Sequence, residues 1–274
     1  MERPALIASD VDGTLLDPLE RVTDRTARVI ARVLAADTPF VLASGRPPRW
    51  IPKVAQAAGL SGYAVCANGA SVYDIARDEV VAVRDIAPER LRDVVNAVDA
   101  ALPDIRVAAE RTVLGRDQPH PFAIEDGFHN PWGNPTGEAD AQAVAPRGEV
   151  LGHRATKLLI RHRGMTSQLL AEAVQAVLVG LDLEVTYSSN SGLIEISAAG
   201  VTKASGLAEV CRLLDVEADK VVVFGDMPND VPMVEWAGHG VAMANAHADL
   251  LAVADEVTAP NSEDGVAQVL ERWF

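Results

Sequence analysis

Short apolar runs alternate with helical repeats of apolar residues along positions 1–84. Apolar residues that recur every three or four positions indicate a helix, whereas an unbroken apolar run bounded by turn residues is typical of a buried strand. The pattern predicts strands at 5–8, 39–43 and 63–66, helices at 23–36 and 50–58, and a hairpin with strands at 71–73 and 80–83. Strands that alternate with helices are typical of βαβ units and a parallel sheet.

The pattern changes near residue 85. A helix is expected from Pro88 to Leu102, because its apolar residues form one stripe. Residues 115–150 contain five prolines and five glycines, which predicts a long loop. The other elements expected here are antiparallel strands at 105–109 and 112–114, a strand at 158–160, a helix at 166–179, and strands at 183–187 and 193–196. Together they predict an inserted α+β domain at residues 85–197.

The alternating pattern resumes after this insertion. A helix is predicted to begin near Lys203, strands are predicted at 220–224 and 240–243, and a final helix is predicted at 263–274. We therefore expect an α/β protein with a doubly wound, Rossmann-like parallel sheet. Its core would consist of residues 1–84 and 198–274, with the α+β domain inserted between these two segments.

Composition narrows the possible partners. The 274 residues are 49% hydrophobic and carry a formal net charge of −15. Sequence-independent binding to nucleic acid needs clustered lysine and arginine, so this charge argues against a nucleic-acid partner. We recognise no bilayer-spanning apolar run and no secretory signal, and therefore expect no membrane partner and a cytoplasmic location. Cys66 and Cys211 are expected to be buried, reduced thiols, and the sequence carries no signal for an oligomeric state.

Polar residues gather where the predicted strands end. The carboxyl ends of parallel strands share one edge of a sheet, so these clusters are expected to converge on a single site. An acidic protein that handles an anionic substrate also needs a local cation or metal. The clusters are Asp10 and Asp12 after the first strand, Ser44 and Gly45 after the second, Lys203 at a helix start, and Asp226, Asn229 and Asp230 after the strand at 220–224.

These strings resemble the haloacid dehalogenase-like hydrolase superfamily, and in particular its Cof-type phosphatases. The matching strings are Asp10-Val11-Asp12-Gly13-Thr14-Leu15-Leu16, Ser44-Gly45-Arg46, Asn68-Gly69, Gly200-Val201-Thr202-Lys203, Gly225-Asp226-Met227-Pro228-Asn229-Asp230 and Asn261-Ser262-Glu263-Asp264-Gly265-Val266. The place of the insertion also resembles the α/β cap of this group. The resemblance implies a Mg²⁺-dependent phosphatase whose cap selects the substrate.

The resemblance also implies a role for each candidate residue. Asp10 would attack phosphorus to form an aspartyl phosphate, and Asp12 would act as general acid and then general base. The implied ligands of Mg²⁺, which prefers oxygen, are the Asp10 carboxylate, the Asp12 backbone carbonyl and Asp226, with Asp230 close by. The implied phosphate-binding residues are Ser44, Gly45, Lys203 and Asn229.

The expected substrates are small phosphate monoesters, such as sugar phosphates or related phosphorylated metabolites. A carboxyl at position 12 is similar to that of the phosphatases and phosphomutases of the superfamily, whereas its dehalogenases lack one. Two alternatives stay open, namely a phosphomutase-like transferase on the same core and a phospho-aspartate regulatory protein of the receiver type. Within the insertion, Arg111, His129 and Trp132 are further candidates for substrate contacts.

Overall fold

The computed structural model describes residues 2–112, 121–130 and 142–274. The chain divides into two compact units. Unit 1 comprises Met1–Ala82 and Thr202–Phe274, and unit 2 comprises Val83–Val201. The sequence prediction placed the corresponding boundaries at 84/85 and 197/198, which is two residues later and four residues earlier than in the structure.

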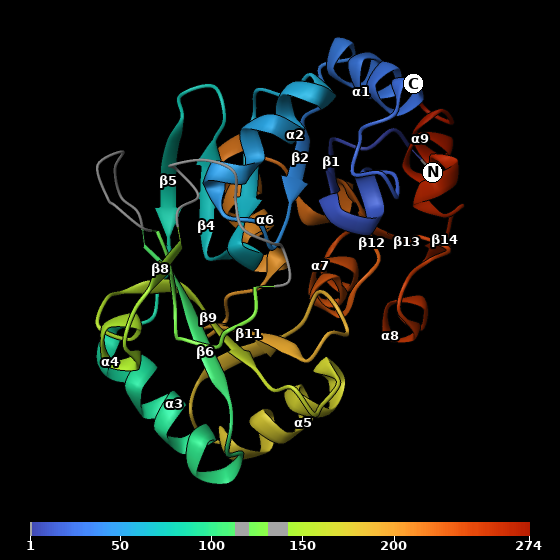
Figure 1. Ribbon diagram of the computed structural model, residues 1–274. Helices are drawn as coiled ribbons and strands as arrows, with labels where there is room; N and C mark the ends of the chain where they lie inside the picture. Colours follow the sequence, from blue (N-terminus) through green and yellow to red (C-terminus); the bar gives the residue numbers. More distant parts are fainter. Residues whose placement is uncertain (1, 113–120, 131–141) are drawn as a thin grey trace. The chain divides into compact units, whose positions relative to one another are not determined.

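The core of unit 1 is an eight-stranded sheet with the strand order β14-β13-β12-β1-β2-β3-β4-β5 (Figure 1). All pairs from β14 to β3 are parallel, and β3 pairs antiparallel with β4. The parallel α/β core predicted from the sequence is therefore confirmed. The strands are β1 (Leu6–Ser9), β2 (Phe40–Ala43), β3 (Tyr63–Cys66), β4 (Ser71–Asp74), β5 (Glu79–Val83), β12 (Val221–Gly225), β13 (His239–Ala242) and β14 (Glu256–Val257).

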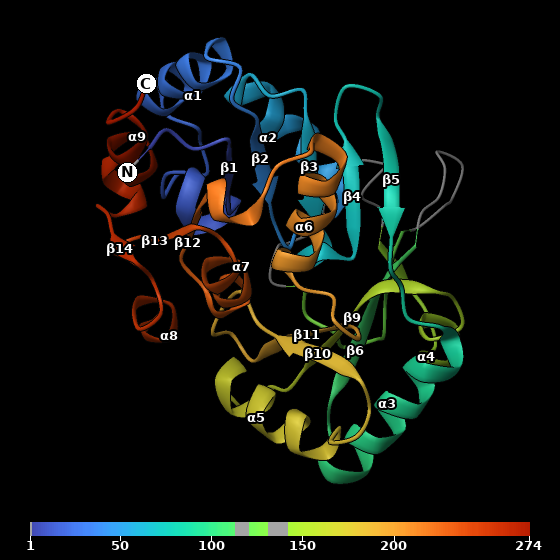
Figure 2. The ribbon, with the colours of Figure 1, turned by 180° about the vertical axis from the view of Figure 1, so that it is seen from behind.

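Helices cover both faces of this sheet. The longer ones are α1 (Asp24–Ala35), α2 (Ile51–Ala58) and α6 (Lys203–Leu214), and the shorter ones are α7 (Val231–Trp236), α8 (Ala248–Leu251) and α9 (Gly265–Leu270). Figures 1 and 2 show α1 and α2 on one face and α6 on the other. Accordingly, Ile7 of β1 belongs to the apolar core on the α1 side, whereas its neighbours Leu6 and Ala8 belong to the core on the α6 side. Such two-sided burial explains why β1 is an unbroken apolar run.

Several short elements complete unit 1. The predicted helix at 263–274 is shorter than expected, because only α9 is α-helical. The sequence prediction also missed α7, α8 and β14, which are too short to show a clear period. The remaining helical turns are Val11–Leu15, Pro48–Trp50, Ala67–Gly69, Ala218–Lys220, Pro228–Asp230 and Asn261–Glu263.

Unit 2 contains a six-stranded sheet with the order β10-β11-β9-β6-β7-β8. The pairs β10–β11, β11–β9, β9–β6 and β6–β7 are antiparallel, and β7–β8 is parallel. Its elements are α3 (Pro88–Ala101), β6 (Arg106–Arg111), β7 (Phe122–Ile124), β8 (Gln142–Val144), α4 (Arg147–Val150), β9 (Ala155–Arg161), α5 (Ser167–Val177), β10 (Leu183–Thr186) and β11 (Leu193–Ala198). This is the α+β composition expected of the insertion.

Two predictions within unit 2 are wrong for the described residues. The segment predicted as a loop at 115–150 contains β7, β8 and α4. Phe122 and Ile124 of β7 are buried in an apolar cluster with Phe128, so tertiary packing overrides the local proline and glycine signals. Thr112 does not continue a strand, because β6 ends at Arg111, and residues 113–114 of the predicted strand lie outside the described residues.

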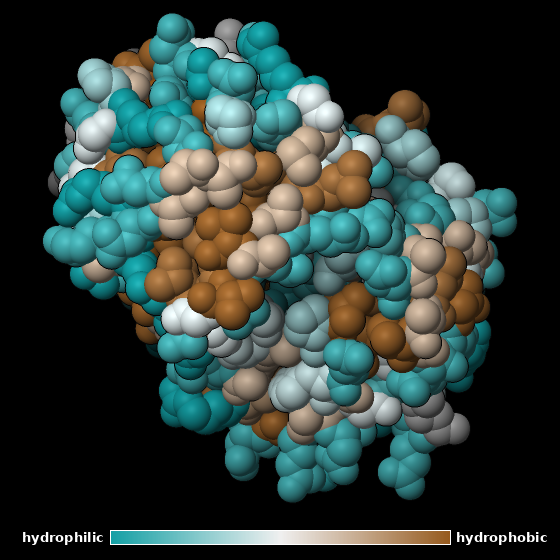
Figure 3. All heavy atoms as spheres, turned by 90° about the horizontal axis from the view of Figure 1, so that it is seen from below, coloured by the Kyte–Doolittle hydropathy of each residue, from teal (hydrophilic) through white to brown (hydrophobic). Residues whose placement is uncertain are grey.

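Three further observations concern the surface, the helices and the cysteines. On the face seen in Figure 3, apolar residues form separate patches that are bordered by hydrophilic ones. Among the helices of the described segments, none combines the length and the apolar character needed to cross a membrane. Cys66 and Cys211 are buried and unbonded to each other, as predicted, and burial raises the pKa of the Cys211 thiol to about 11.

Candidate active site

Two neighbouring parallel strands deliver the central carboxylates. Ser9 of β1 lies opposite Phe224 of β12, so the residues that follow the two strands leave the sheet side by side. The backbone N–H of Asp10 donates a hydrogen bond of 2.9 Å to the Phe224 carbonyl, which extends the ladder to the start of the site. Asp226 follows β12 directly. Parallel pairing thus brings together two carboxylates that are far apart in the sequence.

Three buried carboxylates form one cluster at this edge. Asp10, Asp226 and Asp230 each offer an oxygen, and these oxygens all lie within 4.8 Å of one another. The three residues are 5%, 6% and 0% exposed, so water does little to screen their mutual repulsion. Such a cluster needs positive charge close by.

Lys203 supplies one positive charge inside this cluster. Its side chain is fully buried, and Nζ donates to Oδ1 of Asp10 at 2.5 Å and to Oδ1 of Asp230 at 2.6 Å. Burial by itself lowers the pKa of Lys203, but the carboxylates of Asp10 and Asp230 outweigh burial and raise it above its ordinary value. Lys203 is the first residue of α6, which begins at a capping box between Thr202 and Ser205.

Asp230 also fixes the loop that carries Asp226. Its Oδ2 accepts hydrogen bonds of 3.0 Å from the backbone N–H groups of Asp226 and Met227. Both carboxylate oxygens of Asp230 therefore accept hydrogen bonds from the protein. Oδ1 accepts from the Lys203 ammonium, and Oδ2 accepts from the backbone of this loop. Asp230 was predicted as a metal ligand, and its hydrogen bonds additionally give it a positioning role for Asp226.

The turn after β1 supports Asp226 from the other side. Gly13 has a φ of 78°, and a side chain here would collide with the Asp226 carboxylate. The hydroxyl of Thr14 donates to Oδ1 of Asp226 at 2.8 Å. Sequence reasoning assigned no role to Thr14, although it belongs to the string that begins at Asp10. In the sequence, only its position directly after Asp12-Gly13 indicated that Thr14 could lie in the site.

The cluster holds more negative charge than Lys203 balances. The pKa of Asp10 is raised well above its ordinary value, first by burial and then by the charges of Asp230 and Asp226, although Lys203 opposes the rise. Burial and the Asp230 charge also raise the pKa of Asp226 to about 7. Mg²⁺ is a hard cation that prefers carboxylate oxygens, so the donor set and the surplus negative charge both fit it.

The raised pKa of Asp226 predicts how stability depends on pH and Mg²⁺. An acid whose folded-state pKa lies above its unfolded value stabilises the fold at low pH, and this contribution is lost as the pH rises through about 7. The metal-free protein should therefore melt at a lower temperature at about pH 8 than at about pH 5. Mg²⁺ should raise the melting temperature more at the higher pH, where protons no longer compete for the carboxylates.

Thermal unfolding with EDTA or with Mg²⁺ at the two pH values checks this expectation. An equal or larger Mg²⁺ effect at the lower pH would contradict the proposed metal cluster. Ca²⁺ at the same concentration controls for a non-specific effect of divalent charge, because it prefers longer bonds and more ligands than Mg²⁺.

Asp12 lies apart from the buried cluster. Its side chain is 56% exposed and forms a bidentate ion pair with Arg46, with Nε–Oδ2 at 2.9 Å and Nη2–Oδ1 at 2.5 Å. Burial alone lowers the pKa of Arg46, but the Asp12 carboxylate outweighs this effect and raises it. Arg46 received no role from the sequence, although it follows Ser44 and Gly45 directly. Only the three-dimensional structure joins it to Asp12.

Apart from Lys203, the predicted phosphate-binding residues come from two loops of unit 1. Ser44 follows β2, is buried, and its Oγ accepts a hydrogen bond from the Arg46 backbone N–H at 3.1 Å; Gly45 lies between them. Asn229 is also buried, and its Nδ2 donates to Oδ1 of Asn68 at 3.1 Å. The second amide hydrogen of Asn229 is left for another acceptor. Within the segments described, Oδ1 of Asn229 has no hydrogen-bond donor.

Comparison with known proteins identifies the family. Residues 7–270 match the model of a family described as haloacid dehalogenase-like hydrolase. The chain belongs to this family. The match covers both segments of unit 1 and spans unit 2, so the haloacid dehalogenase-like assignment includes the inserted unit as well as the core. The resemblance predicted from the sequence strings is confirmed.

One curated relative and two solved structures are similar to this chain. The chain is 29% identical over 280 residues to the 5-amino-6-(5-phospho-D-ribitylamino)uracil phosphatase YitU of Bacillus subtilis, covering 99% of the chain and 98% of that protein. It shares the fold of SMU.1108c from Streptococcus mutans, with a TM-score of 0.82, 22% identity and 98% coverage of both chains. The subclass IIB sugar phosphatase BT4131 matches with a TM-score of 0.80 and 21% identity, over 97% of this chain and 98% of that one.

Proposed function

We propose that this hydrolase is a Mg²⁺-dependent phosphatase that cleaves small phosphate monoesters through an aspartyl-phosphate intermediate. The observation that carries the proposal is the convergence of Asp10, Asp226 and Asp230 around the Lys203 ammonium at the carboxyl ends of β1 and β12. A buried carboxylate beside cationic groups is suited to attack an electrophile that is itself anionic.

Asp10 is the proposed nucleophile. One of its oxygens attacks phosphorus, the phosphorus–oxygen bond to the alcohol breaks, and the phosphoryl group stays on the Asp10 carboxyl as an acyl phosphate. Water then attacks phosphorus, which releases inorganic phosphate and regenerates the carboxylate. The Nζ of Lys203 lies 2.5 Å from Oδ1 of Asp10 and orients this carboxylate. The third N–H group of the ammonium can donate a hydrogen bond to a phosphate oxygen.

The residues around the nucleophile would bind the metal ion and the phosphate group. Asp10, the Asp12 backbone carbonyl and Asp226 would hold Mg²⁺, with Asp230 close by. When bound, the ion would neutralise charge between the carboxylate and the phosphate. Ser44, Gly45, Lys203 and Asn229 would bind the phosphate oxygens as hydrogen-bond donors.

Asp12 is the proposed general acid and base. As an acid it donates a proton to the leaving alcohol oxygen, and as a base it then takes a proton from the attacking water. Its exposed side chain lies outside the crowded carboxylate cluster, which supports a role at the open side of the site. The bidentate Arg46 pair orients the carboxylate and has to loosen when Asp12 carries a proton.

Substitution of Asp12 by asparagine should lower kcat by about 10²- to 10⁴-fold, because proton transfer is lost in both half-reactions. Asp17→Asn is a matched control, since Asp17 is another aspartate of the same segment that pairs with an arginine, Arg21. The pre-steady-state burst of alcohol release measures the first half-reaction, and phosphate release in a single turnover measures the second. If both stay unchanged in Asp12→Asn, the acid–base assignment is wrong.

The expected substrates are sugar phosphates or similar phosphorylated metabolites. YitU is named for a phosphorylated ribityl compound and BT4131 for sugar phosphates, which supports this class for the present chain. We further propose that residues 85–197, the predicted cap, select the substrate. Of its candidate contact residues, Arg111 lies at the end of β6 with its Nη2 on the Glu149 carbonyl, and Trp132 lies outside the described residues.

A screen of phosphorylated metabolites with Mg²⁺ tests this proposal. The expected result is release of inorganic phosphate from one class of monoester, and loss of the release on removal of Mg²⁺ by EDTA. Phosphate detection combined with sugar analysis separates hydrolysis from the phosphomutase alternative, which would yield an isomerised sugar phosphate. Absence of both products across the panel would contradict the proposed reaction class.

A further inference from the structure

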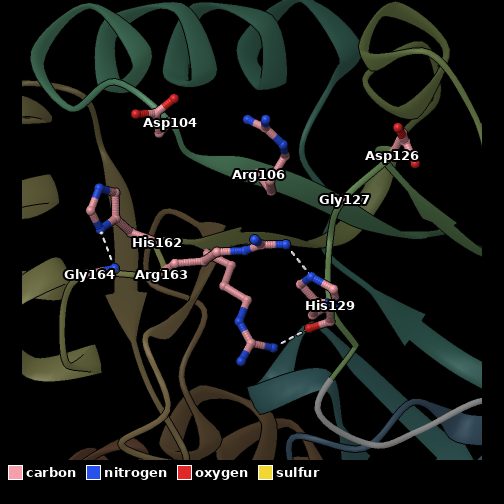
Figure 4. Close-up of a pocket in the computed structure, with 9 residues that line it drawn as sticks. Asp104, Arg106, Asp126, Gly127, His129, His162, Arg163 and Gly164 are labelled. Carbon is pink, nitrogen blue, oxygen red and sulfur yellow. Dashed lines mark hydrogen bonds between the residues drawn. The ribbon is translucent and has the colours of Figure 1, made fainter.

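A cavity of about 450 Å³ lies within unit 2, at the end of its sheet. Three arginines line it, Arg106 from the start of β6, Arg161 from the end of β9 and Arg163 just beyond, together with two histidines, His129 and His162. Figure 4 shows the labelled side chains of Arg106, Arg163 and His129 around this hollow. All of these residues belong to unit 2, whereas the residues of the carboxylate cluster belong to unit 1.

The sheet places two of these arginines directly against each other. Arg106 of β6 lies opposite Arg161 of β9 in the antiparallel register. Like charges that face each other across neighbouring strands destabilise a sheet. An anion bound in the cavity would reduce this repulsion.

The three arginines also lack the carboxylate partners that other arginines have. Arg25 pairs with Glu271 at 2.6 Å and Arg154 pairs with Asp85 at 2.5 Å. By contrast, across residues 2–112, 121–130 and 142–274 no carboxylate lies within 4.0 Å of Arg106, Arg161 or Arg163. This holds although the chain has a net charge of −15.

Two carboxylates line the same cavity without neutralising it. Asp104 and Asp126 lie on either side of the Arg106 side chain in Figure 4, and neither forms an ion pair with it. The three guanidinium groups outnumber these two acids, so the cavity is electropositive even with both histidines neutral. A local positive potential in an acidic protein concentrates anionic ligands.

Hydrogen bonds hold the cationic groups in place. Arg161 donates to the backbone carbonyls of His129 and Ser191, and Arg163 donates to Nε2 of His129. His162 accepts a hydrogen bond at Nδ1 from the Gly164 backbone at 3.1 Å. Because one ring nitrogen of each histidine accepts, the other carries the proton in the neutral ring. Both imidazoles thus add a donor, and the arginines keep unused N–H groups.

We propose that this cavity binds the phosphoryl group of a small molecule, through residues other than those of the proposed catalytic centre. Guanidinium groups present forked donors that match the oxygens of phosphate. Three of them line this cavity, and protein contacts hold those of Arg161 and Arg163. The volume lies in the range of small-molecule sites, so there is room for an organic group beside the phosphate. Inorganic phosphate and a phosphate monoester are the two sources of this shared chemistry.

Site-resolved NMR of the 274-residue chain tests the proposal. Inorganic phosphate is titrated into the metal-free, nitrogen-15-labelled chain at constant ionic strength, with ribose 5-phosphate and acetate as separate arms. The backbone amides of Gly127 and Gly164 report on the cavity, and that of Gly45 reports on the proposed catalytic site. We expect saturable shifts at Gly127 and Gly164 with both phosphate probes. Tighter binding of inorganic phosphate would identify the free ion as the ligand, and tighter binding of ribose 5-phosphate would identify a phosphate monoester.

Substitutions then test the arginines individually. Arg163→Gln and Arg106→Gln should each weaken binding by about tenfold or more, because each removes a charged donor group. Arg163 is exposed, so Arg163→Gln keeps the test interpretable if the half-buried Arg106 is needed for folding. Arg92→Gln is the matched control, since it removes an exposed arginine of α3 outside the cavity.

Three results would overturn the proposal. One is a linear, non-saturating shift at Gly127 and Gly164 with both phosphate probes. Another is equal phosphate affinity in Arg163→Gln and Arg92→Gln. The third is tighter binding of acetate than of phosphate, which would assign the cavity to carboxylates instead.

Discussion

Substitution of Asp10 by asparagine is expected to lower kcat for phosphate monoesters by about 10⁴-fold or more, because an amide cannot form the acyl-phosphate intermediate. The amide oxygen still accepts a hydrogen bond from Lys203, so the substitution keeps the geometry of the site. It also removes one of the crowded buried charges that raise the pKa values of the cluster. The folded variant should therefore be at least as stable as the wild type without Mg²⁺.

Activity and stability are measured on the same preparations to separate the two effects. Asp93→Asn is the matched control, because Asp93 is an exposed aspartate of α3 in unit 2. Full activity in Asp10→Asn would exclude the nucleophile assignment. An inactive variant with a strongly reduced melting temperature would instead indicate a structural role for the carboxylate, so thermal unfolding has to accompany every rate.

Of the substitutions considered, Lys203→Met is expected to lower the free energy of unfolding the most. Methionine fills a similar volume but leaves the buried carboxylates of Asp10 and Asp230 without their cation. Breaking a buried ion pair by removing one partner typically costs about 3–5 kcal/mol. Urea unfolding at about pH 8 measures this loss. The loss should shrink at about pH 5, because burial and neighbouring charges raise the pKa of the Asp10 carboxyl, which therefore protonates more readily there.

Lys220→Met provides the comparison for Lys203. Lys220 pairs with Glu217 at 2.8 Å on the surface, with 59% of its side chain exposed. Such exposed pairs contribute little, so the free energy of unfolding of Lys220→Met should stay close to that of the wild type. A Lys203→Met variant as stable as Lys220→Met would contradict the account of Lys203 as the counter-charge of the cluster. Addition of Mg²⁺ should partly restore its stability, because the ion replaces the missing positive charge.

The parallel core was predictable from the sequence because its strands are buried on both faces. Leu6 and Ala8 pack on one side of the sheet and Ile7 on the other, which leaves an apolar run that ends at Asp10. Where such a run stops, the chain reaches the ligand-binding edge of the sheet. The position of the candidate site therefore follows from local patterning, although its residues are widely separated along the chain.

The direction of individual side chains was not predictable in the same way. Asp12 follows Asp10 by two residues, yet its side chain turns to Arg46 on another loop instead of joining the buried cluster. The hydrogen bond between Thr14 and Asp226 likewise connects residues from distant parts of the chain. Such contacts depend on turn geometry and on the register of neighbouring strands, which composition and spacing do not encode.

Unit 2 shows a second reason for failed prediction. Proline and glycine around β7 indicated a loop, because both residues disfavour regular structure locally. The strand forms nevertheless, since Ala108–Glu110 of β6 provide hydrogen-bonding partners and the Phe122 and Phe128 rings, 6.4 Å apart, are buried together. Tertiary pairing of this kind outweighs weak local preference.

Rapid-quench trapping of the enzyme with a phosphorus-32-labelled monoester tests whether Asp10 is the nucleophile. If Asp10 is the nucleophile, acid quenching in the first turnover will yield protein-bound label that hydroxylamine removes, as expected of an acyl phosphate. The label should approach one per chain at its maximum, and Asp10→Asn should show none. Phosphate release without any bound label, or label that persists in Asp10→Asn, would contradict the account.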